Sequence, residues 1–128
     1  MRVLFAIKSL VVPGGGAERV LVDVANGLDA RGHEVGVLTF DPPEPTFYPL
    51  SEDVRRICLG IGPPGKPVPR ARLLRSLPAI RRAARRFQPS ISVAFMHSTY
   101  VPYGVALWGS GIPVVASEHA APHHFRGR

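Results

Sequence analysis

Three consecutive glycines stand where the chain passes from its first apolar run into a helical pattern. Residues 13–19 read PGGGAER and follow the apolar residues 3–7. Glycines let the backbone approach a ligand closely, and a helix start offers free amide groups and the positive end of the helix dipole. We therefore interpret Gly14, Gly15 and Gly16 as candidate contacts for a phosphate or another anion. The alternative is a loop that needs glycine only for its backbone angles.

Two histidines come within three residues of the ends of later apolar runs that read as strands. They belong to the pairs His97-Ser98 and Glu118-His119. A histidine at the carboxyl end of a strand can donate a hydrogen bond to an oxygen that gains negative charge during a reaction. His119 is therefore a candidate catalytic residue. Its alternative role is a hydrogen bond to a neighbouring loop, and His97-Ser98 can either bind a hydroxyl group or cap the next helix.

The glycines can be compared with two known nucleotide-binding sequence motifs. Gly14 and Gly16 begin a G-x-G-x-x-G fingerprint, and Asp41 follows the second predicted strand, where an acidic residue would bind the ribose of NAD. Against this, Arg19 occupies the third glycine position, and the loop is longer than that fingerprint describes. An NAD-dependent oxidoreductase stays open as an alternative, whereas the nucleoside-triphosphate loop is excluded because G-K-[ST] is absent.

The apolar pattern predicts five strands that alternate with three helices. Strands are expected at 3–7, 33–40, 54–59, 91–96 and 112–116. The first helix is expected from Ala17 to a cap at Gly32, and the third over 100–109. The second is expected over 70–87 in two pieces, with Ser76 as the cap of the second piece and Pro78 in its first turn. The predicted buried positions are Ala17, Val20, Leu21, Val24, Ala25 and Leu28 in the first helix, and Leu77, Ile80, Ala84 and Phe87 in the second.

This order predicts an α/β fold: a Rossmann-like open parallel sheet with helices on both faces. We expect the strand order 3-2-1-4-5, in which the connections reverse direction between the first and fourth strands. The glycines, His97 and His119 should then share one cleft at the carboxyl edge of the sheet. The fifth strand should form an exposed apolar edge, through which we expect self-association.

The amino-acid composition restricts the cellular location and the classes of binding partner. The 128 residues fit a single domain, and no apolar run reaches the roughly 18 residues that a membrane span needs. Cys58 is the only cysteine, which excludes an intrachain disulfide, makes zinc improbable and favours a cytoplasmic location. The net charge is +7, much of it on arginines between 70 and 86. These suit either an anionic membrane surface or a solvated helix face; nucleic acid is disfavoured because no aromatic residues interleave with them.

The glycine segment extends into a longer pattern that resembles a known family. Residues 15–20 (GGAERV) and 28–35 (LDARGHEV), together with Ser117-Glu118-His119, are similar to the opening half of glycosyltransferase family 4, also called glycosyl transferases group 1. The resemblance covers nearly the whole chain. It implies the N-terminal half of a GT-B fold, which consists of two Rossmann-like domains that face each other across a cleft. It also implies a retaining transfer from a nucleotide-sugar donor without a bound metal or other cofactor.

The resemblance assigns roles to the candidate residues. The N-terminal domain of the family mainly binds the acceptor, here expected to be a saccharide or a lipid-linked saccharide at the cytoplasmic face of a membrane. The positions of Gly14 to Gly16 come near the donor phosphates, and that of His119 near the donor sugar, beside Glu118. The nucleotide-binding C-terminal domain is absent from this chain, so we expect residues 1–128 alone to be inactive. A stand-alone flavodoxin-like binding module is the non-enzyme alternative.

Overall fold

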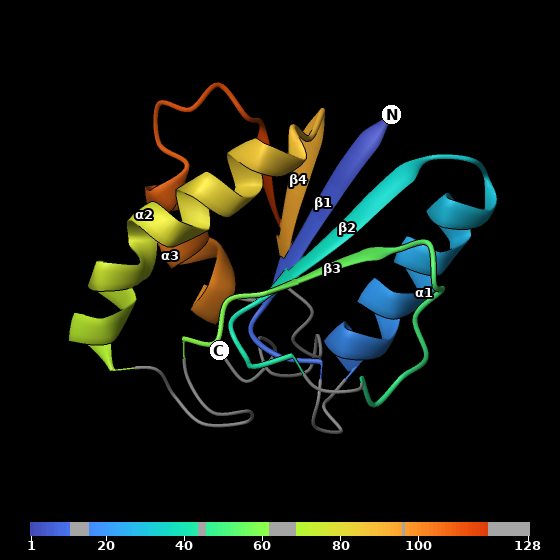
Figure 1. Cartoon of the computed structure of the whole chain (residues 1–128), viewed down its shortest axis with the longest axis horizontal. Helices are drawn as coiled ribbons and strands as arrows, with labels where there is room; N and C mark the ends of the chain where they lie inside the picture. Colours follow the sequence, from blue (N-terminus) through green and yellow to red (C-terminus); the bar gives the residue numbers. More distant parts are fainter. Residues whose placement is uncertain (11–15, 44–45, 62–68, 96, 118–128) are drawn as a thin grey trace, which may run out of the picture.

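The computed structural model of the protein describes residues 1–10, 16–43, 46–61, 69–95 and 97–117. Along the chain they form β1 (Arg2–Ile7), α1 (Gly16–Ala30), β2 (Glu34–Thr39), β3 (Arg55–Cys58), α2 (Arg70–Phe87), β4 (Ile91–Phe95), α3 (His97–Ala106) and β5 (Val114–Ser117). The predicted order of strands and helices is confirmed, and the strand bounds differ from the predicted ones by one or two residues. Helices cover both faces of the sheet, with α1 on one side and α2 and α3 on the other (Figure 1).

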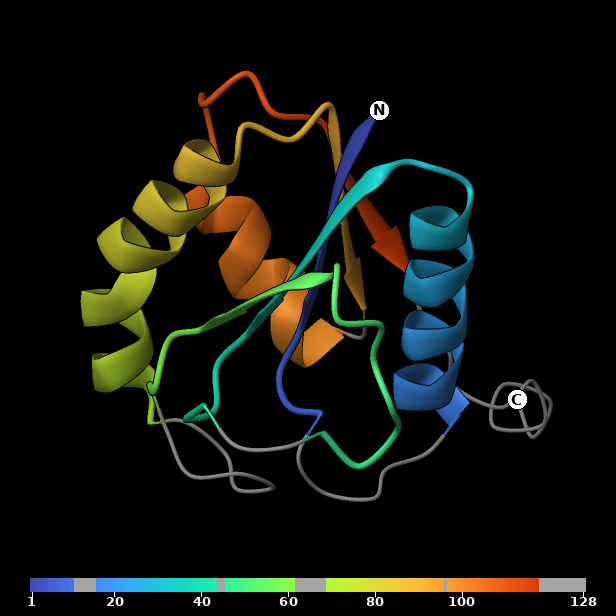
Figure 2. The ribbon, with the colours of Figure 1, turned by 45° about the vertical axis from the view of Figure 1, so that its right-hand side comes forward.

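The five strands form one parallel sheet in the order β3-β2-β1-β4-β5, as predicted. β1 is the central strand: Val3 pairs with Val35 of β2 on one side and with Ile91 of β4 on the other. The strands fan out with the usual twist of parallel sheets (Figure 2). β5 forms one edge, and Val115 on it is 46% exposed. Self-association through this edge stays a prediction.

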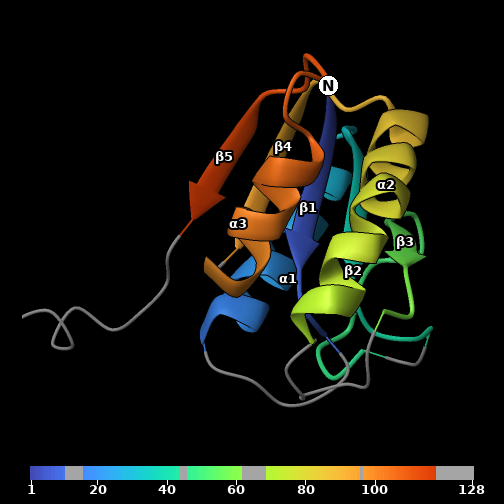
Figure 3. The same ribbon diagram turned by 90° about the vertical axis from the view of Figure 1, so that its left-hand side faces the viewer.

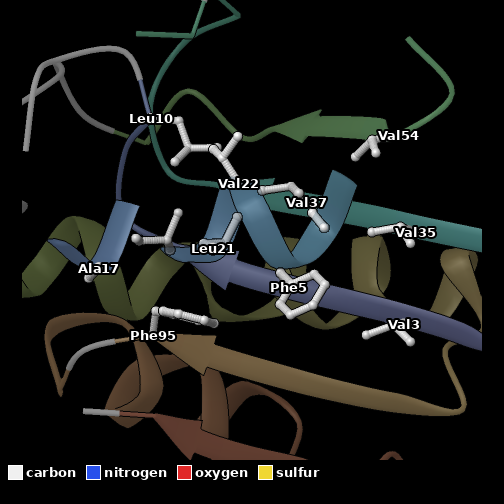
Figure 4. Close-up of a cluster of buried hydrophobic side chains, with 12 residues drawn as sticks. Val3, Phe5, Leu10, Ala17, Leu21, Val22, Val35, Val37, Val54 and Phe95 are labelled. Atoms are coloured by element: carbon white, nitrogen blue, oxygen red, sulfur yellow. The ribbon is translucent and has the colours of Figure 1, made fainter. Parts of the chain in front are cut away.

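The face of the sheet under α1 carries one apolar cluster. β1 contributes Val3, Phe5 and Ile7 to this cluster because alternate residues of a strand point to the same face. The rings of Phe5 and Phe95 meet edge to face at a centroid distance of 6.1 Å, and this contact joins β1 to β4 (Figure 4). From α1 the buried side chains are Ala17, Leu21, Val22 and Ala25, with Leu28 partly buried.

The predicted inward face of α1 was wrong at two positions. Val20 and Val24 are 38% and 42% exposed, and Val22 is buried instead. The cause is the segment between β2 and β3, which packs against the Val22 side of the helix with Tyr48, Leu50 and Val54. Backbone and side-chain hydrogen bonds hold it there: Asn26 Nδ2 donates to Pro49 O (3.0 Å), Ser51 N donates to Asn26 Oδ1 (2.8 Å) and Ser51 Oγ donates to Asp29 Oδ2 (2.7 Å).

Gly32 ends α1 as predicted. Its φ of +90° lies in the region that favours glycine. The amide of Gly32 donates to Asp29 O (3.0 Å) and that of His33 to Leu28 O (3.2 Å), which is the pair of bonds of a Schellman motif. This turn directs the chain back into β2, whose first residue is Glu34.

α2 is one continuous helix, so the prediction of two pieces was wrong. Ser76 does not cap a second helix; its hydroxyl donates to Arg72 O within the same helix (2.8 Å). Pro78 lies in the interior and removes one helical amide donor. Packing maintains the helix through this point, because Leu73 and Leu77 before the proline and Ile80 after it contact the same apolar cluster. The predicted burial of Ile80, Ala84 and Phe87 is confirmed, and Leu77 is partly buried.

Tyr103 anchors α3 to the opposite face of the sheet. It is fully buried, and its hydroxyl lies 2.5 Å from Ser92 Oγ, which in turn donates to Leu4 O at 3.0 Å. Burial raises the pKa of Tyr103 to about 12, against a smaller lowering by the hydrogen bond with Ser92. The phenol therefore stays neutral throughout the physiological range and acts as a structural link between α3, β4 and β1.

Two glycine-to-alanine variants should change stability in opposite directions. At Gly36 an added Cβ would lie 2.8 Å from Phe87 Cε1 and 3.1 Å from Leu4 Cδ1, so Gly36→Ala should lower the free energy of unfolding by about 1–3 kcal/mol. At Gly27, inside α1, nothing lies within 4 Å, and Gly27→Ala should raise it by about 0.5–1 kcal/mol. Urea unfolding measures both. Equal stability of the two variants would contradict the packing of Phe87 on β2.

Candidate functional site

The carboxyl ends of three adjacent strands, β1, β4 and β5, define the candidate site. β1 lies between β2 and β4, and β5 lies beyond β4. The helix that follows β1 covers one face of the sheet, and the helix that follows β4 covers the other (Figure 3). The two chain segments therefore diverge at this edge, which is the position where open α/β sheets bind ligands.

The described residues place part of the predicted set at this edge. Gly16 is the first residue of α1, and the backbones of His97 and Ser98 form the first turn of α3. The prediction that α3 begins only at residue 100 was wrong, because the helix starts as soon as β4 ends. The side chains of His97 and Ser98 lie outside what the structure describes. The same holds for the whole of four predicted residues: Gly14, Gly15, Glu118 and His119.

The strand register aligns the exits of β4 and β5. Phe95, the last residue of β4, pairs with Ser117, the last residue of β5. His97 therefore follows its strand by two residues, as His119 does in the sequence. β4 and β5 thus end at paired positions of the same edge of the sheet.

Gly16 faces open space. A Cβ built on it would have nothing within 4 Å, and its φ is not among the positive values that would require glycine. The residue is exposed at the start of a 15-residue helix. The N-terminus of α3, which has 10 residues, lies at the same edge of the sheet. Two helix dipoles thus present their positive ends here, an arrangement that attracts an anionic group.

Asp41 is buried just beyond β2 and does not present its carboxylate to a ligand. It is 1% exposed. Its Oδ2 accepts hydrogen bonds from Ser9 Oγ (2.7 Å) and from the amide of Leu10 (3.3 Å). Its Oδ1 lies 3.8 Å from Arg56 Nη2 of β3, a separation that makes an ion pair without a hydrogen bond. The interpretation of Asp41 as a ribose-binding residue is therefore wrong.

We call the residues between β1 and α1, 8–15, the glycine segment. The role of Asp41 is to hold the start of this segment. Ser9 and Leu10 are the residues that leave β1, and Asp41 connects them to the end of β2. Backbone hydrogen bonds add to this connection, since the amide of Phe40 donates to Lys8 O (3.0 Å) and that of Phe47 donates to Leu10 O (2.8 Å). The sequence did not predict this function, because an acidic residue after a strand gives the same sequence pattern whether its carboxylate binds a ligand or a neighbouring loop.

Two buried threonines lie in the same region of the sheet. Thr39 ends β2 and Thr99 lies in the first turn of α3, and both are fully buried. Neither hydroxyl oxygen has a hydrogen-bond partner among the residues that the structure describes. Buried polar groups of this kind are uncommon in folded proteins and often occur near functional sites. Within the described ranges, no group of three or more His, Cys, Asp or Glu residues could hold a metal ion, and metal-free chemistry stays a prediction.

Comparison with known proteins points to one family and one fold. The sequence model of a family described as Glycosyltransferase Family 4 matches residues 14–128. No curated protein sequence matches the chain. Among solved structures, sucrose-phosphate synthase from Thermosynechococcus elongatus is similar over 100% of this chain, with a TM-score of 0.61 and 18% sequence identity. The chain spans 35% of that protein's length. At this identity the likeness shows the fold, and the fold is the predicted Rossmann-like one.

Proposed function

Because this chain belongs to glycosyltransferase family 4, we propose that it is the acceptor-side domain of a retaining glycosyltransferase. Its donor would be a nucleotide sugar, and its acceptor a saccharide or a lipid-linked saccharide. The observation that carries the proposal is the carboxyl edge of the sheet. There α1 and α3 begin on opposite faces of the sheet, and a Cβ added to Gly16 would meet nothing within 4 Å.

Each candidate residue has a chemical role in this proposal. Gly14, Gly15 and Gly16 would let the donor phosphates approach the positive end of α1. His119 would donate a hydrogen bond to an oxygen that gains negative charge as the sugar leaves the donor. His97, Ser98 and Glu118 would bind hydroxyl groups of the acceptor or the sugar.

The proposal includes a second domain that holds the nucleotide. Sugar transfer requires donor and acceptor to be fixed in reacting geometry with water excluded, and one wall of a cleft does not supply this. The match to sucrose-phosphate synthase supports the idea, since this chain corresponds to about a third of that protein. We therefore propose that residues 1–128 bind an acceptor but do not catalyse transfer alone.

The environment of Asp41 argues against the alternative of an NAD-dependent oxidoreductase. In that class an acidic side chain after the second strand binds the ribose hydroxyls. Here the carboxylate is buried and engaged by Ser9 and Leu10. To bind this carboxylate, a ribose would have to displace the hydroxyl of Ser9 and the amide of Leu10 from it.

A transfer assay on two proteins tests the proposed function. Residues 1–128 and the complete gene product are each incubated with radiolabelled UDP- and GDP-sugars and a panel of saccharide acceptors. We expect labelled product only from the complete gene product. NAD serves as the control ligand and should not bind to either protein. Turnover by residues 1–128 would contradict the need for a second domain, and NAD binding with no transfer by the complete product would contradict the proposed function itself.

A further inference from the structure

The outer surface of α2 and α3 exposes several large apolar side chains. The two helices lie side by side on one face of the sheet (Figure 3). Leu74 of α2 is 66% exposed, and Val101 and Val105 of α3 are 57% and 56% exposed. Trp108, two residues after α3, is 83% exposed. Val101 and Val105 are spaced by four residues, which places them on one side of α3, and Trp108 follows Val105 by three residues in the turn after the helix. We call these four residues the apolar stripe.

A groove between the two helices continues the apolar stripe. It has a volume of about 240 Å³. Leu73, Leu74 and Leu77 line it from α2, and Val101 and Val105 line it from α3. Leu73 and Leu77 also contact the buried cluster, so the groove is an outward extension of the protein core. Contiguous exposed apolar surface of this kind marks a site of interaction with a protein or a membrane.

The charges around the apolar stripe are of one sign. Between Val54 and Ser117 the sequence has ten Lys and Arg residues and no Asp or Glu. Seven of these are arginines of α2. Arg72 donates to Ile61 O (3.0 Å) and is used within the fold. By contrast, Arg75, Arg82, Arg85 and Arg86 are exposed on α2.

Arg81 holds the position of Trp108. It donates from Nη1 to Trp108 O (2.7 Å) and to Ala106 O (3.3 Å), and so it satisfies carbonyl groups at the end of α3. The amide of Trp108 donates to Val105 O at 3.2 Å. The backbone at Trp108 is thus fixed, while the side chain extends into solvent. Treating all arginines of α2 as one solvated or lipid-binding set was therefore wrong for Arg72 and Arg81.

We propose that the α2–α3 surface binds an anionic lipid bilayer. The apolar stripe would enter the boundary between headgroups and acyl chains, and the exposed arginines would bind lipid phosphates. Trp side chains favour this boundary because the ring is apolar and its N–H is polar. Phosphates of a nucleic acid would explain the arginines but not the apolar stripe, and an apolar protein partner would explain the stripe but not the arginines. A bilayer with anionic lipids matches both.

Binding of this kind would be peripheral. Among the described helices, none is both long and apolar enough to cross a membrane. α2 and α3 both begin at the carboxyl edge of the sheet and end at the opposite edge (Figure 3). Attachment along both helices would therefore lay this face of the sheet on the bilayer, with the carboxyl edge at the border of the contact. A lipid-linked acceptor could then reach the site without leaving the membrane. This last step rests on the proposed function, whereas the binding of the bilayer does not.

The single tryptophan makes the proposal directly measurable. Trp108 is the only Trp in the chain, so its fluorescence reports on this surface alone. With phosphatidylcholine vesicles that contain 30% phosphatidylglycerol, we expect a blue shift of the emission and quenching by brominated lipid. Added salt should reverse both, and vesicles of pure phosphatidylcholine should bind far more weakly. Absence of a blue shift with anionic vesicles would overturn the proposal.

Matched variants separate this surface from general adsorption. The double variant Arg82→Gln, Arg85→Gln should weaken vesicle binding by about twenty-five-fold, since each charge near an anionic surface contributes about fivefold. The control Arg19→Gln, Arg31→Gln removes exposed arginines from and just beyond α1 and should change binding much less.

The same comparison is available for valine. Val101→Ser, Val105→Ser should weaken binding clearly, and Val20→Ser, Val24→Ser on α1 should not. Circular dichroism verifies that each variant is folded. Equal losses in the test and control variants would overturn the assignment to the α2–α3 surface. A doubled mass without vesicles, accompanied by the same blue shift, would also overturn it and would assign the surface to a second copy of the chain.

Discussion

Replacing His119 with alanine is expected to lower the kcat of the complete transferase by about a hundredfold to a thousandfold, with little change in KM. The size of the effect is that of removing one hydrogen-bond donor from the oxygen that gains charge in a transition state. Such an interaction forms only as the sugar bond breaks, so its loss should appear in kcat and not in substrate binding. The measurement is steady-state kinetics with a fixed nucleotide-sugar donor.

A second histidine provides the control for this experiment. His33 follows the Gly32 turn and precedes β2, so it lies at the amino edge of the sheet, opposite the candidate site. His33→Ala should leave kcat and KM close to those of the wild type. A loss in His119→Ala that appears only in KM would show that His119 binds a substrate in its ground state and has no catalytic role.

Replacing Asp41 with alanine is expected to lower the free energy of unfolding by about 3 kcal/mol. The substitution removes the acceptor that Ser9 Oγ and the amide of Leu10 share, and it removes the charge that faces Arg56. Loss of the acceptor of a buried hydrogen bond costs about 1–3 kcal/mol, and loss of one member of the ion pair adds to this. Domains of this size have about 5–15 kcal/mol of stability in total, so the loss is a substantial share.

Two further variants identify the cause of the loss at Asp41. Asp41→Asn keeps the shape and an acceptor oxygen but removes the charge, and it should cost about 1–2 kcal/mol. Asp23→Ala removes an exposed carboxylate from α1 and should change stability by less than about 0.5 kcal/mol. Urea unfolding measures all three variants. If Asp41→Ala were as stable as Asp23→Ala, the carboxylate would not hold the start of the glycine segment in solution.

Local patterns in the sequence were sufficient to predict the fold. Apolar runs indicated all five strands, and Gly32 indicated the end of α1 through a backbone conformation that few other residues adopt. The alternation of strands and helices then restricted the topology to a parallel sheet with the observed order. These signals are short-range, and each depends on only a few neighbouring residues.

The failures came from contacts between segments far apart in the sequence. Val20 and Val24 fit the helical period as well as Val22 does, and only the packing of the segment before β3 decides which of them is buried. Pro78 is usually a helix breaker, yet the contacts of Leu77 and Ile80 with the cluster under α2 and α3 outweigh the loss of one hydrogen bond.

The candidate site was predicted only in part, again because some of its contacts join segments that are far apart in the sequence. The edge of the sheet follows from topology, so the backbones of Gly16, His97 and Ser98 lie at that edge, while their function as one site stays a prediction. The role of Asp41 depends on a pairing with Ser9, 32 residues away, which no local pattern reveals. The apolar stripe was also missed, since its exposure depends on how α2 and α3 pack against each other and the sheet.

The central position of β1 has a consequence for synthesis on the ribosome. β1 pairs with β2 and also with β4, and the second pairing joins Val3 to Ile91. After Cys58 has emerged, β1, α1, β2 and β3 can assemble, but one edge of the most apolar strand has no partner until β4 follows. At about 5–20 residues per second this interval lasts roughly a few seconds. During that time the nascent chain presents Val3 to Ile7 as an open template for pairing, so chaperone access should matter most in this window.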